Sequence, residues 1–378
     1  MNVDFHAIDE LPADALEFWN KRRMEQDPLA CFTTGVEWFR MMAEGNDPPA
    51  TVCVARAADG RPGAILPLLF REGELAAPSL GGWFGTGRVH VARVFGGDLV
   101  WDDSSHLDPG ALWRGILERY PDVSAIRLDH VASGARSASV QGSCVPGNRV
   151  FAAREFRGMP HYRLELPATF EECCRIRSSR SIKQIRRHAK RLGELDEDGL
   201  VVVEMRTPGQ LADSAGEIER LVAGTWQATA LGHGLDISQV ARVAERGWVR
   251  AFLLRSGSTP VAFVLCYQSA GTLIREQSGY DPEFAKYYPG EVLLYRMLER
   301  LYEDDTPRVV DFGVGEGYHK RMFSNKRMTV DAIWVVRDAT ENRTRFRRYA
   351  LAAAVDALAR RTARRLGIER RLSRRRKK

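Results

Sequence analysis

Several features that define whole classes of protein are missing from these 378 residues. No apolar run approaches the roughly 20 residues that span a bilayer, so no membrane-spanning helix is expected. The segment Met1 to His6 lacks the basic-then-apolar layout of a secretory signal peptide. These absences argue against an integral membrane or secreted protein, and we expect a cytoplasmic one.

Cysteine is scarce and is not arranged for metal or disulfide chemistry. The six cysteines have no metal-ligand spacing, and Cys173 and Cys174 are adjacent within a predicted helix. Such thiols are typical of packing residues in a reducing compartment. Because the cysteines lack metal-ligand spacing, we expect no metal. A Gly-x-Ser-x-Gly elbow is also absent, which disfavours a nucleophilic serine mechanism.

Charge is unevenly distributed along the chain. The formal net charge is +7, but the segment from Arg343 to Lys378 alone carries 15 basic and two acidic residues, a net +13. Residues 1–342 carry a net −6. An acidic body offers nucleic acid little to bind, so no specific DNA partner is expected.

The segment from Val309 to Lys320 combines a short apolar strand with alternating glycines and titratable side chains. Val309 to Phe312 has the composition of a buried strand, and the glycines that follow permit sharp turns and close approach of a ligand. Strand 271–280 and helix 291–301 precede it, so these three elements predict a βαβ unit with parallel strands. The helix starts at Pro289-Gly290, and its free backbone N–H groups form a potential anion site. A purely structural βαβ unit is the alternative.

Apolar periodicity predicts a mixed α/β chain throughout. The segment 132–148 is expected to form a loop. The glycine-rich segment 73–102 is suited to lining a pocket, and equally to forming loops and short strands. Predicted helices are two within 11–44, then 111–120, 169–192, 211–230 and 291–301. Predicted strands are 51–57, 63–70, 125–128, 151–156, 161–166, 200–205, 250–254, 261–267, 271–280, 309–312 and 330–336.

Four stretches together resemble the CelD/BcsL-type acetyltransferases, a branch of the GNAT superfamily related to the FemAB enzymes. They are Leu166 to Leu192 with its basic run, Leu221 to Trp226, Tyr280 to Leu294, and Asp311-Phe312-Gly313-x-Gly315 followed by Lys320. His319 stands where the family usually has Tyr. The resemblance implies an acyl-CoA N-acyltransferase (GNAT) fold with a degenerate N-terminal copy at 1–164, a catalytic domain at 165–340 and a basic helical tail at 341–378.

The resemblance also implies an acyl-CoA donor, with acetyl-CoA as the example, and a small-molecule acceptor. The pyrophosphate is expected at Tyr288, Pro289, Gly290, Glu291 and Val292, with close approach permitted at Gly313 and Gly315. Candidate bases are Glu276 and Asp311, and Tyr318, His319 and Lys320 are candidates for acid or anion anchor. Candidate substrate-binding residues are Arg186, Arg187, Trp226 and Tyr280.

Each assignment has a structural alternative. Asp311 is also suited to cap the following turn, and Lys320 to pair with Glu316. The basic residues at 175–191 are equally suited to a solvated helix face.

Three functions remain open from the sequence. The first is an acyl-CoA-dependent acyltransferase acting on an amine or hydroxyl, with cell-envelope or polysaccharide precursors as acceptors suggested by relatives. The second is a Fem-type transferase that uses aminoacyl-tRNA, and the third is a non-catalytic interaction protein. The oligomeric state is not predicted.

The tail contains an alanine-rich apolar stripe, Leu351, Val355, Leu358 and Leu366, flanked by arginines. A basic amphipathic helix can bind an anionic membrane peripherally. The alternative is a helix packed on the domain and followed by a solvated basic tail.

Overall fold

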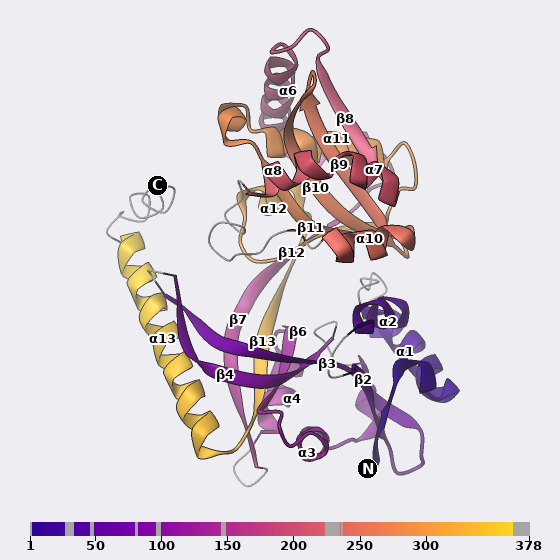
Figure 1. Ribbon diagram of the computed structural model, residues 1–378, viewed down its shortest axis with the longest axis vertical. Coiled ribbons are helices and arrows are strands. Elements are labelled where there is room, and N and C mark those ends of the chain that lie inside the picture. Colours follow the sequence, from indigo (N-terminus) through magenta and orange to yellow (C-terminus); the bar gives the residue numbers. More distant parts are fainter. Residues whose placement is uncertain are drawn as a thin grey trace. The chain divides into compact units, whose positions relative to one another are not determined.

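The computed structural model describes residues 2–26, 34–45, 49–79, 82–95, 100–144, 149–223, 235 and 237–365 (Figure 1). Packing divides the chain into two compact units. The first contains Met1–Arg23, Thr34–Gly158 and Val330–Lys378, and the second contains Met24–Thr33 and Met159–Thr329. Each unit has its own hydrophobic clusters, in which helices cover β-strands. The chain is a mixed α/β protein, as predicted.

The sheet of the first unit has the order β1-β2-β3-β4-β6-β13-β7, with β5 beside β3. β4 and β6 are parallel because α3 carries the chain from one to the other. The elements are β1 (Asn2–His6), α1 (Ala13–Gln26), α2 (Val36–Ala43), β2 (Thr51–Arg56), β3 (Pro62–Ser79), β4 (Gly82–Val94), β5 (Val100–Trp101), α3 (Pro109–Arg119), β6 (Ala125–Ala132), α4 (Ala135–Gly142), β7 (Val150–Glu165), β13 (Lys326–Arg337) and α13 (Thr340–Arg365).

The sheet of the second unit has the order β7-β12-β11-β10-β9-β8. β11 and β12 are parallel, with α11 as the crossover, so the predicted βαβ unit is confirmed. The elements are α5 (Phe170–Arg175), α6 (Ser179–Gly193), β8 (Leu200–Met205), α7 (Pro208–Asp213), α8 (Ala215–Ala223), α10 (Ile237–Glu245), β9 (Val249–Ser256), β10 (Thr259–Ser269), β11 (Thr272–Tyr280), the 3-10 helix η4 (Pro282–Tyr287), α11 (Pro289–Leu301), β12 (Val309–Val314) and α12 (Tyr318–Phe323).

Two long strands, β7 and β13, continue from one unit into the other. β7 ends antiparallel to β12 in the second unit, and β13 continues antiparallel to β6 in the first. Each unit therefore repeats one order: antiparallel strands, a helical crossover to a parallel strand, and a last antiparallel strand supplied by a distant part of the chain. This repetition agrees with the predicted tandem arrangement. The units nevertheless depart from the predicted boundaries, because residues 330–340 pack with the first unit.

Two stretches predicted to be interrupted form long strands instead. Segment 73–102 was expected to form loops or short strands, yet β3 and β4 form a hairpin paired from Leu68 opposite Val94 to Ser79 opposite Gly82. The two strands predicted within 151–166 are the single strand β7. Gly158 adopts a left-handed φ of 61° inside that strand, which glycine accommodates, and the strand continues through it.

Two helix predictions also need correction. Segment 132–148 contains α4, which begins after Gly134 (φ 106°), where a loop was expected. The long helix predicted at 211–230 is divided into α7 and α8 at Ser214, and α8 is described as far as Ala223. Small polar residues such as Ser214 favour local turns over helix interiors. Residues 224–230 of the predicted helix lie outside the described part of the chain.

The core of the second unit lies between its sheet and the helices α6 and α11. Buried residues recur along α6 at helical spacing, and together with the apolar face of α11 they form one cluster with β9 to β12. The buried residues of α6 are Ile182, Ile185, His188, Ala189 and Leu192.

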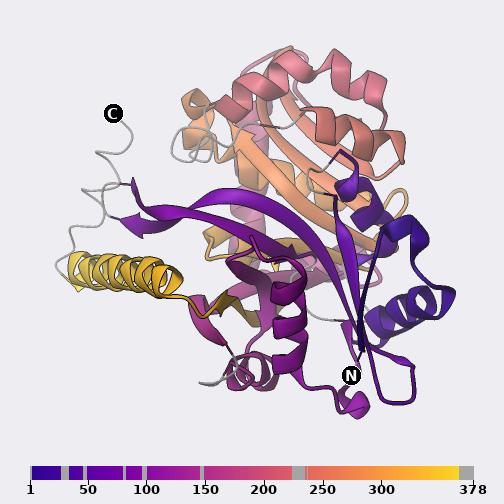
Figure 2. The same cartoon turned by 60° about the horizontal axis from the view of Figure 1, so that its bottom comes forward.

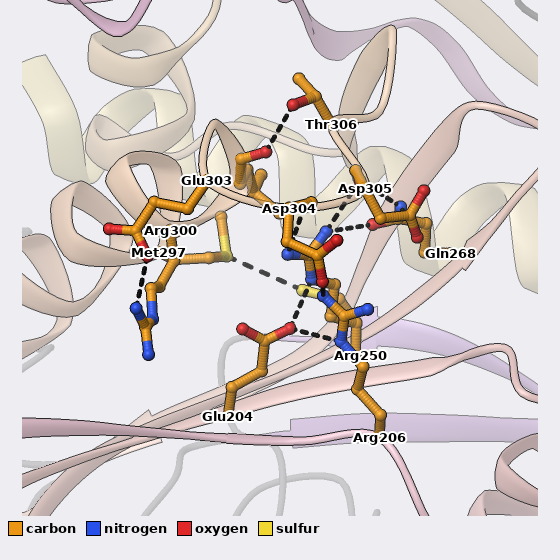
Figure 3. Close-up of polar contacts among 12 residues, drawn as sticks. Glu204, Arg206, Arg250, Gln268, Met297, Arg300, Glu303, Asp304, Asp305 and Thr306 are labelled. Carbon is orange, nitrogen blue, oxygen red and sulfur yellow. Dashed lines mark hydrogen bonds and ion pairs between the residues drawn. The ribbon is translucent and has the colours of Figure 1, made fainter.

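A buried arginine fastens the far end of α11 to this sheet (Figure 3). Arg250 of β9 donates to Glu204 of β8 at 2.8 Å and to Gln268 of β10 at 3.0 Å. It also donates to the backbone carbonyls of Asp305 at 3.0 Å and Asp304 at 2.9 Å, in the turn between α11 and β12. Four hydrogen bonds engage all three nitrogens of a guanidinium that is almost fully buried, so this network fixes the turn against the sheet.

Candidate functional site

The parallel strands β11 and β12 separate soon after they meet. Their pairing consists of Thr272 with Val309, Leu273 with Val310 and Ile274 with Asp311. Beyond this point β11 continues beside β10 to Tyr280, while β12 continues beside β7 to Val314. The facing backbone edges of residues 275–280 and 312–314 are therefore not paired with each other, which leaves β11 donors and acceptors open at the carboxyl end of the sheet.

Glu276 is the extra residue of a β-bulge in β11. Leu265 lies opposite Gln277 and Cys266 lies opposite Arg275, so no β10 residue faces Glu276. Its side chain is accessible to solvent, yet the surrounding protein desolvates the carboxyl and raises its pKa. Bulges are frequent beside active sites, and desolvation makes a carboxylate a stronger base.

Arg275 lies beside two titratable residues of α12, His319 and Lys320. The Nε of Arg275 and the Nε2 of His319 are both buried, with no hydrogen-bond partner in the described part of the chain. Burial and the charges of Arg275 and Lys320 lower the pKa of His319 to about 4, so its imidazole is neutral at pH 7. Burial and Arg275 likewise lower the pKa of Lys320 to about 8. The divergence of the strands is thus flanked by a basic cluster, Arg275, His319 and Lys320.

Asp311 is held by side chains of β7 that the sequence did not single out. Its carboxylate accepts from Nε2 of His161 at 2.7 Å and from Nε of Arg163 at 3.0 Å. It also accepts from the backbone N–H of Gly313 at 2.7 Å, so the predicted turn cap is present. Burial alone would raise the pKa of Asp311, but these partners hold it below its usual range. With its lone pairs engaged in this way, Asp311 is suited to positioning the end of β12.

The glycines after Asp311 shape a turn that Lys320 closes. Gly313 and Gly315 have φ values of 73° and 101°, which favour glycine. Nζ of Lys320 donates to the carbonyl oxygens of Val314 at 2.7 Å and Gly313 at 3.3 Å. Glu316, the alternative partner for Lys320, instead accepts from Tyr162 at 3.0 Å and Arg321 at 3.1 Å.

The N-terminus of α11 has no side-chain cap. Tyr288, the residue before the helix, has left-handed φ and ψ of 51°. Pro289 has no N–H, and the N–H groups of Glu291 and Val292 both donate to the carbonyl of Tyr288. The N–H of Gly290 is thereby left for an external acceptor, at the positive end of the helix dipole.

The equivalent helix of the first unit is closed to anions. Before α3, the carboxylate of Asp108 caps the helix by accepting from the N–H of Gly110 at 2.9 Å. In addition, β4 pairs with β6 up to Val94 opposite Leu128, and Val94 is the last residue of β4. In the first unit the helix N-terminus is capped by Asp108, and β4 and β6 stay paired to the end of β4. Both features differ from the second unit, where α11 is uncapped and β11 and β12 separate.

Two tyrosines and the helix α6 surround the start of α11. A Cβ on Gly290 would lie 4.0 Å from the ring of Tyr280. The exposed ring of Tyr288 packs on His188 of α6, with ring centroids 4.9 Å apart. His188 is buried, and its Nδ1 has no hydrogen-bond partner in the described part of the chain. The aromatic surface is therefore continuous with α6.

The predicted basic residues of α6 divide into two groups. Nε of Arg186 donates to the hydroxyl of Tyr295 at 3.0 Å, which ties α6 to α11. The side chains of Lys183, Arg187 and Arg191 are exposed, and no ion pair to them occurs among the described residues. Arg187 thus belongs to an exposed basic face, whereas Arg186, which is also exposed, contacts Tyr295 of α11.

The other predicted site residues have different surroundings. The carboxyl of Glu291, in the first turn of α11, has a pKa raised by burial. Tyr318 is 63% exposed. Trp226 lies outside the described part of the chain. Among the described residues, no group of three or more potential ligands could hold a metal ion. Within the same part of the chain, every helix is too short or too polar to cross a membrane.

Comparison with known proteins agrees with this geometry. Residues 179–321 match the family model described as an acetyltransferase (GNAT) domain. The structure is similar to that of FemX, at 11% identity, with 89% of this chain and 98% of that chain covered and a TM-score of 0.55. It is also similar to a tandem GNAT protein from the clavulanic acid biosynthesis pathway, at 16% identity, with coverages of 89% and 99% and a TM-score of 0.53.

At these identities the two structures show the fold alone. No protein of curated function matches the chain. The family match, the parallel pair that separates at Ile274 and Asp311, and the repetition of this topology in both units lead to one identification. The protein has the GNAT fold, and the part of it that matches the GNAT-domain model is residues 179–321.

Proposed function

We propose that the second unit is an acyltransferase that moves an acyl group from acyl-CoA to an amine or hydroxyl acceptor, as in the CelD/BcsL-type family that its motifs resemble. One observation carries the proposal: the uncapped N-terminus of α11 follows β11, the strand that separates from its parallel neighbour and carries the bulged Glu276. A phosphate site and an unpaired strand edge are what a nucleotide-linked thioester requires.

The donor is bound through its phosphates. The N–H of Gly290 and the dipole of α11 face the pyrophosphate, and the exposed basic face of α6 (Lys183, Arg187 and Arg191) supplies positive charge nearby. Tyr280 and Tyr288 offer exposed rings on which an adenine can stack. The first unit has Asp108 at the corresponding helix start, so it does not bind the donor.

In this proposal Glu276 is the general base and Lys320 is the general acid. The acceptor nitrogen or oxygen forms a bond to the acyl carbon, the carbon–sulfur bond breaks, and Glu276 receives the acceptor's proton. The raised pKa of Glu276 makes it a stronger base than an ordinary glutamate. Lys320, whose pKa of about 8 leaves it mostly protonated at pH 7, gives a proton to the departing thiolate. Unpaired N–H groups of β11 stabilise the oxyanion.

Aminoacyl-tRNA is a second candidate donor because the exposed basic face of α6 also suits a nucleic-acid backbone. Its terminal adenosine and phosphates would use the same helix start. Acetyl-CoA and aminoacyl-tRNA can be titrated separately into the full-length protein, and the one that binds identifies the donor.

The decisive experiment uses two matched variants, Gly290→Glu and Gly209→Glu. Both glycines follow a proline in the first turn of a helix, but α7 is capped by Thr207, whereas α11 has no side-chain cap. A carboxylate is favourable near either helix N-terminus, so both variants should fold. Calorimetric titration with acetyl-CoA should show at least about tenfold weaker binding for Gly290→Glu and unchanged binding for Gly209→Glu.

Equal effects of the two variants would refute the placement of the donor. Binding of aminoacyl-tRNA that is lost in Gly290→Glu, without any binding of acetyl-CoA, would select the second donor. If neither donor binds the folded protein, the catalytic proposal fails and a non-catalytic interaction role is favoured.

A further inference from the structure

The C-terminal helix α13 packs one of its faces on the first unit. It lies alongside β3 and β4 (Figures 1 and 2). Phe346 and Tyr349 are both 3% exposed and belong to a cluster with Trp334 and Val336 of β13. The rings of Phe346 and Trp334 lie 5.6 Å apart, and Asn342 on the same face is also buried. This face anchors the helix to the unit, as one of the two predictions for the tail required.

The opposite face of α13 presents apolar side chains to solvent. Leu351, Val355 and Leu358 are 67%, 60% and 65% exposed. No other large aliphatic side chain in the described part of the chain is as exposed. Their spacing of four and three residues places them in one stripe, and at about 100° per residue this stripe lies across the helix from Phe346 and Tyr349. A folded protein rarely leaves such a stripe uncovered without a partner.

The charge around the stripe restricts the partner. Arg347 and Arg348 are exposed and precede Leu351 by four and three residues, so they flank the stripe on both sides. Neither arginine forms an ion pair with a described residue. From Arg343 to Lys378 the sequence has 15 basic residues against Asp356 and Glu369, whereas residues 1–342 are net acidic. The partner must therefore be anionic and must also accept apolar side chains.

An anionic lipid surface meets both conditions. Its headgroups attract Lys and Arg, and the boundary beneath them accepts apolar side chains from one face of a helix. Nucleic acid satisfies the charge but gives no reason for the aliphatic stripe. We propose that α13 docks the protein on an anionic lipid surface, with Leu351, Val355 and Leu358 entering the headgroup boundary and Arg347 and Arg348 contacting headgroups. The docking is independent of the proposed acyl transfer.

The test is flotation of the full-length protein with vesicles of phosphatidylcholine alone and of phosphatidylcholine mixed with phosphatidylglycerol. The variants are Val355→Glu, in the stripe, and Ala350→Glu, which is exposed on the same helix outside it. Both add one negative charge, so an effect of charge alone is the same in each. Both positions are exposed, and unfolding temperatures should stay near that of the wild type.

Wild type and Ala350→Glu should float with the mixed vesicles at low salt and stay behind with phosphatidylcholine alone. Val355→Glu should bind the mixed vesicles at least about tenfold more weakly, since the substitution replaces an apolar contact with lipid by a charge. Raising the salt should release the wild type. Failure to float, equal flotation with neutral vesicles, or equal losses in the two variants would each overturn the proposal. Binding to an RNA oligonucleotide that Val355→Glu leaves unchanged, without flotation, would assign the basic segment to nucleic acid instead.

Discussion

Nε2 of His161 lies 2.7 Å from a carboxylate oxygen of Asp311, although the two residues are 150 positions apart in the sequence. The contact joins β7 to β12 beside the point where β11 and β12 separate. It suits Asp311 to a structural role, whereas Glu276, on the strand that diverges, has no hydrogen-bond partner of this kind among the described residues. The two predicted bases can therefore be told apart by experiment.

Replacing Asp311 by Asn should destabilise the protein. The buried carboxylate is hydrogen-bonded by His161 and Arg163, and removing one partner of a buried charge pair costs about 3–5 kcal/mol. The free energy of unfolding in urea at pH 7 measures this loss. A loss below about 1 kcal/mol would contradict the structural role.

The same carboxylate predicts a dependence of stability on pH. The pKa of Asp311 is lowered in the folded protein, so its stabilisation is complete above the unfolded value near 3.8. That stabilisation is lost as the pH falls through the lower, folded pKa. Acid unfolding of Asp311→Asn should lack this component, and identical acid profiles for the two proteins would contradict the assignment.

Glu276→Gln should lower turnover by roughly 10²–10⁴-fold, the usual contribution of a positioned general base. Stability should be unchanged or higher, because the raised pKa of Glu276 means that folding disfavours its charged form. In the wild type, kcat/KM should rise with pH through an apparent pKa above the ordinary value of 4.5. Turnover within a factor of about two of wild type would exclude Glu276 as the base.

Activity should also fall as the pH rises through about 8, where Lys320 loses its proton. Burial and Arg275 depress this pKa, so the limb should lie well below the usual lysine range. Lys320→Arg should lower kcat/KM and remove the limb near pH 8, because a guanidinium stays protonated and cannot give its proton to the thiolate. The measurement is kcat/KM against pH for both proteins with one acceptor. A limb near pH 8 that persists in Lys320→Arg would place the titrating group elsewhere.

Arg250→Met should cost about 3 kcal/mol or more of unfolding free energy, because it leaves Glu204 and the carbonyls of Asp304 and Asp305 without their buried donor. Arg206→Met is the matched control. Arg206 also contacts Glu204, at 2.6 Å, but its side chain is 36% exposed, against 2% for Arg250. The control should cost about 1 kcal/mol or less. Similar losses for the two variants would show that burial does not determine the strength of this network.

Local sequence determined much of the GNAT domain. The apolar runs around Leu273 and Val310 and the helical spacing in α11 lie within 45 residues of one another, so the βαβ unit follows from periodicity and the Pro289-Gly290 start. The capping threonine of α5, Thr169, was likewise identifiable from local pattern. The basic run of α6 predicted a helix, but local pattern did not show that Arg186 donates a hydrogen bond to Tyr295 of α11.

Only the tertiary structure decided which charges form the site. His161 and Arg163 lie on β7, far from Asp311 in sequence, and nothing in their local pattern indicates that partner. The bulge that leaves Glu276 unpaired arises from the register of β10 and β11, which depends on pairing between strands. The same holds for α13: periodicity predicted an apolar stripe, but the packing of Phe346 and Tyr349 decided which face is buried. Residue spacing specifies faces and elements, whereas the partner of each face is set by contacts between distant segments.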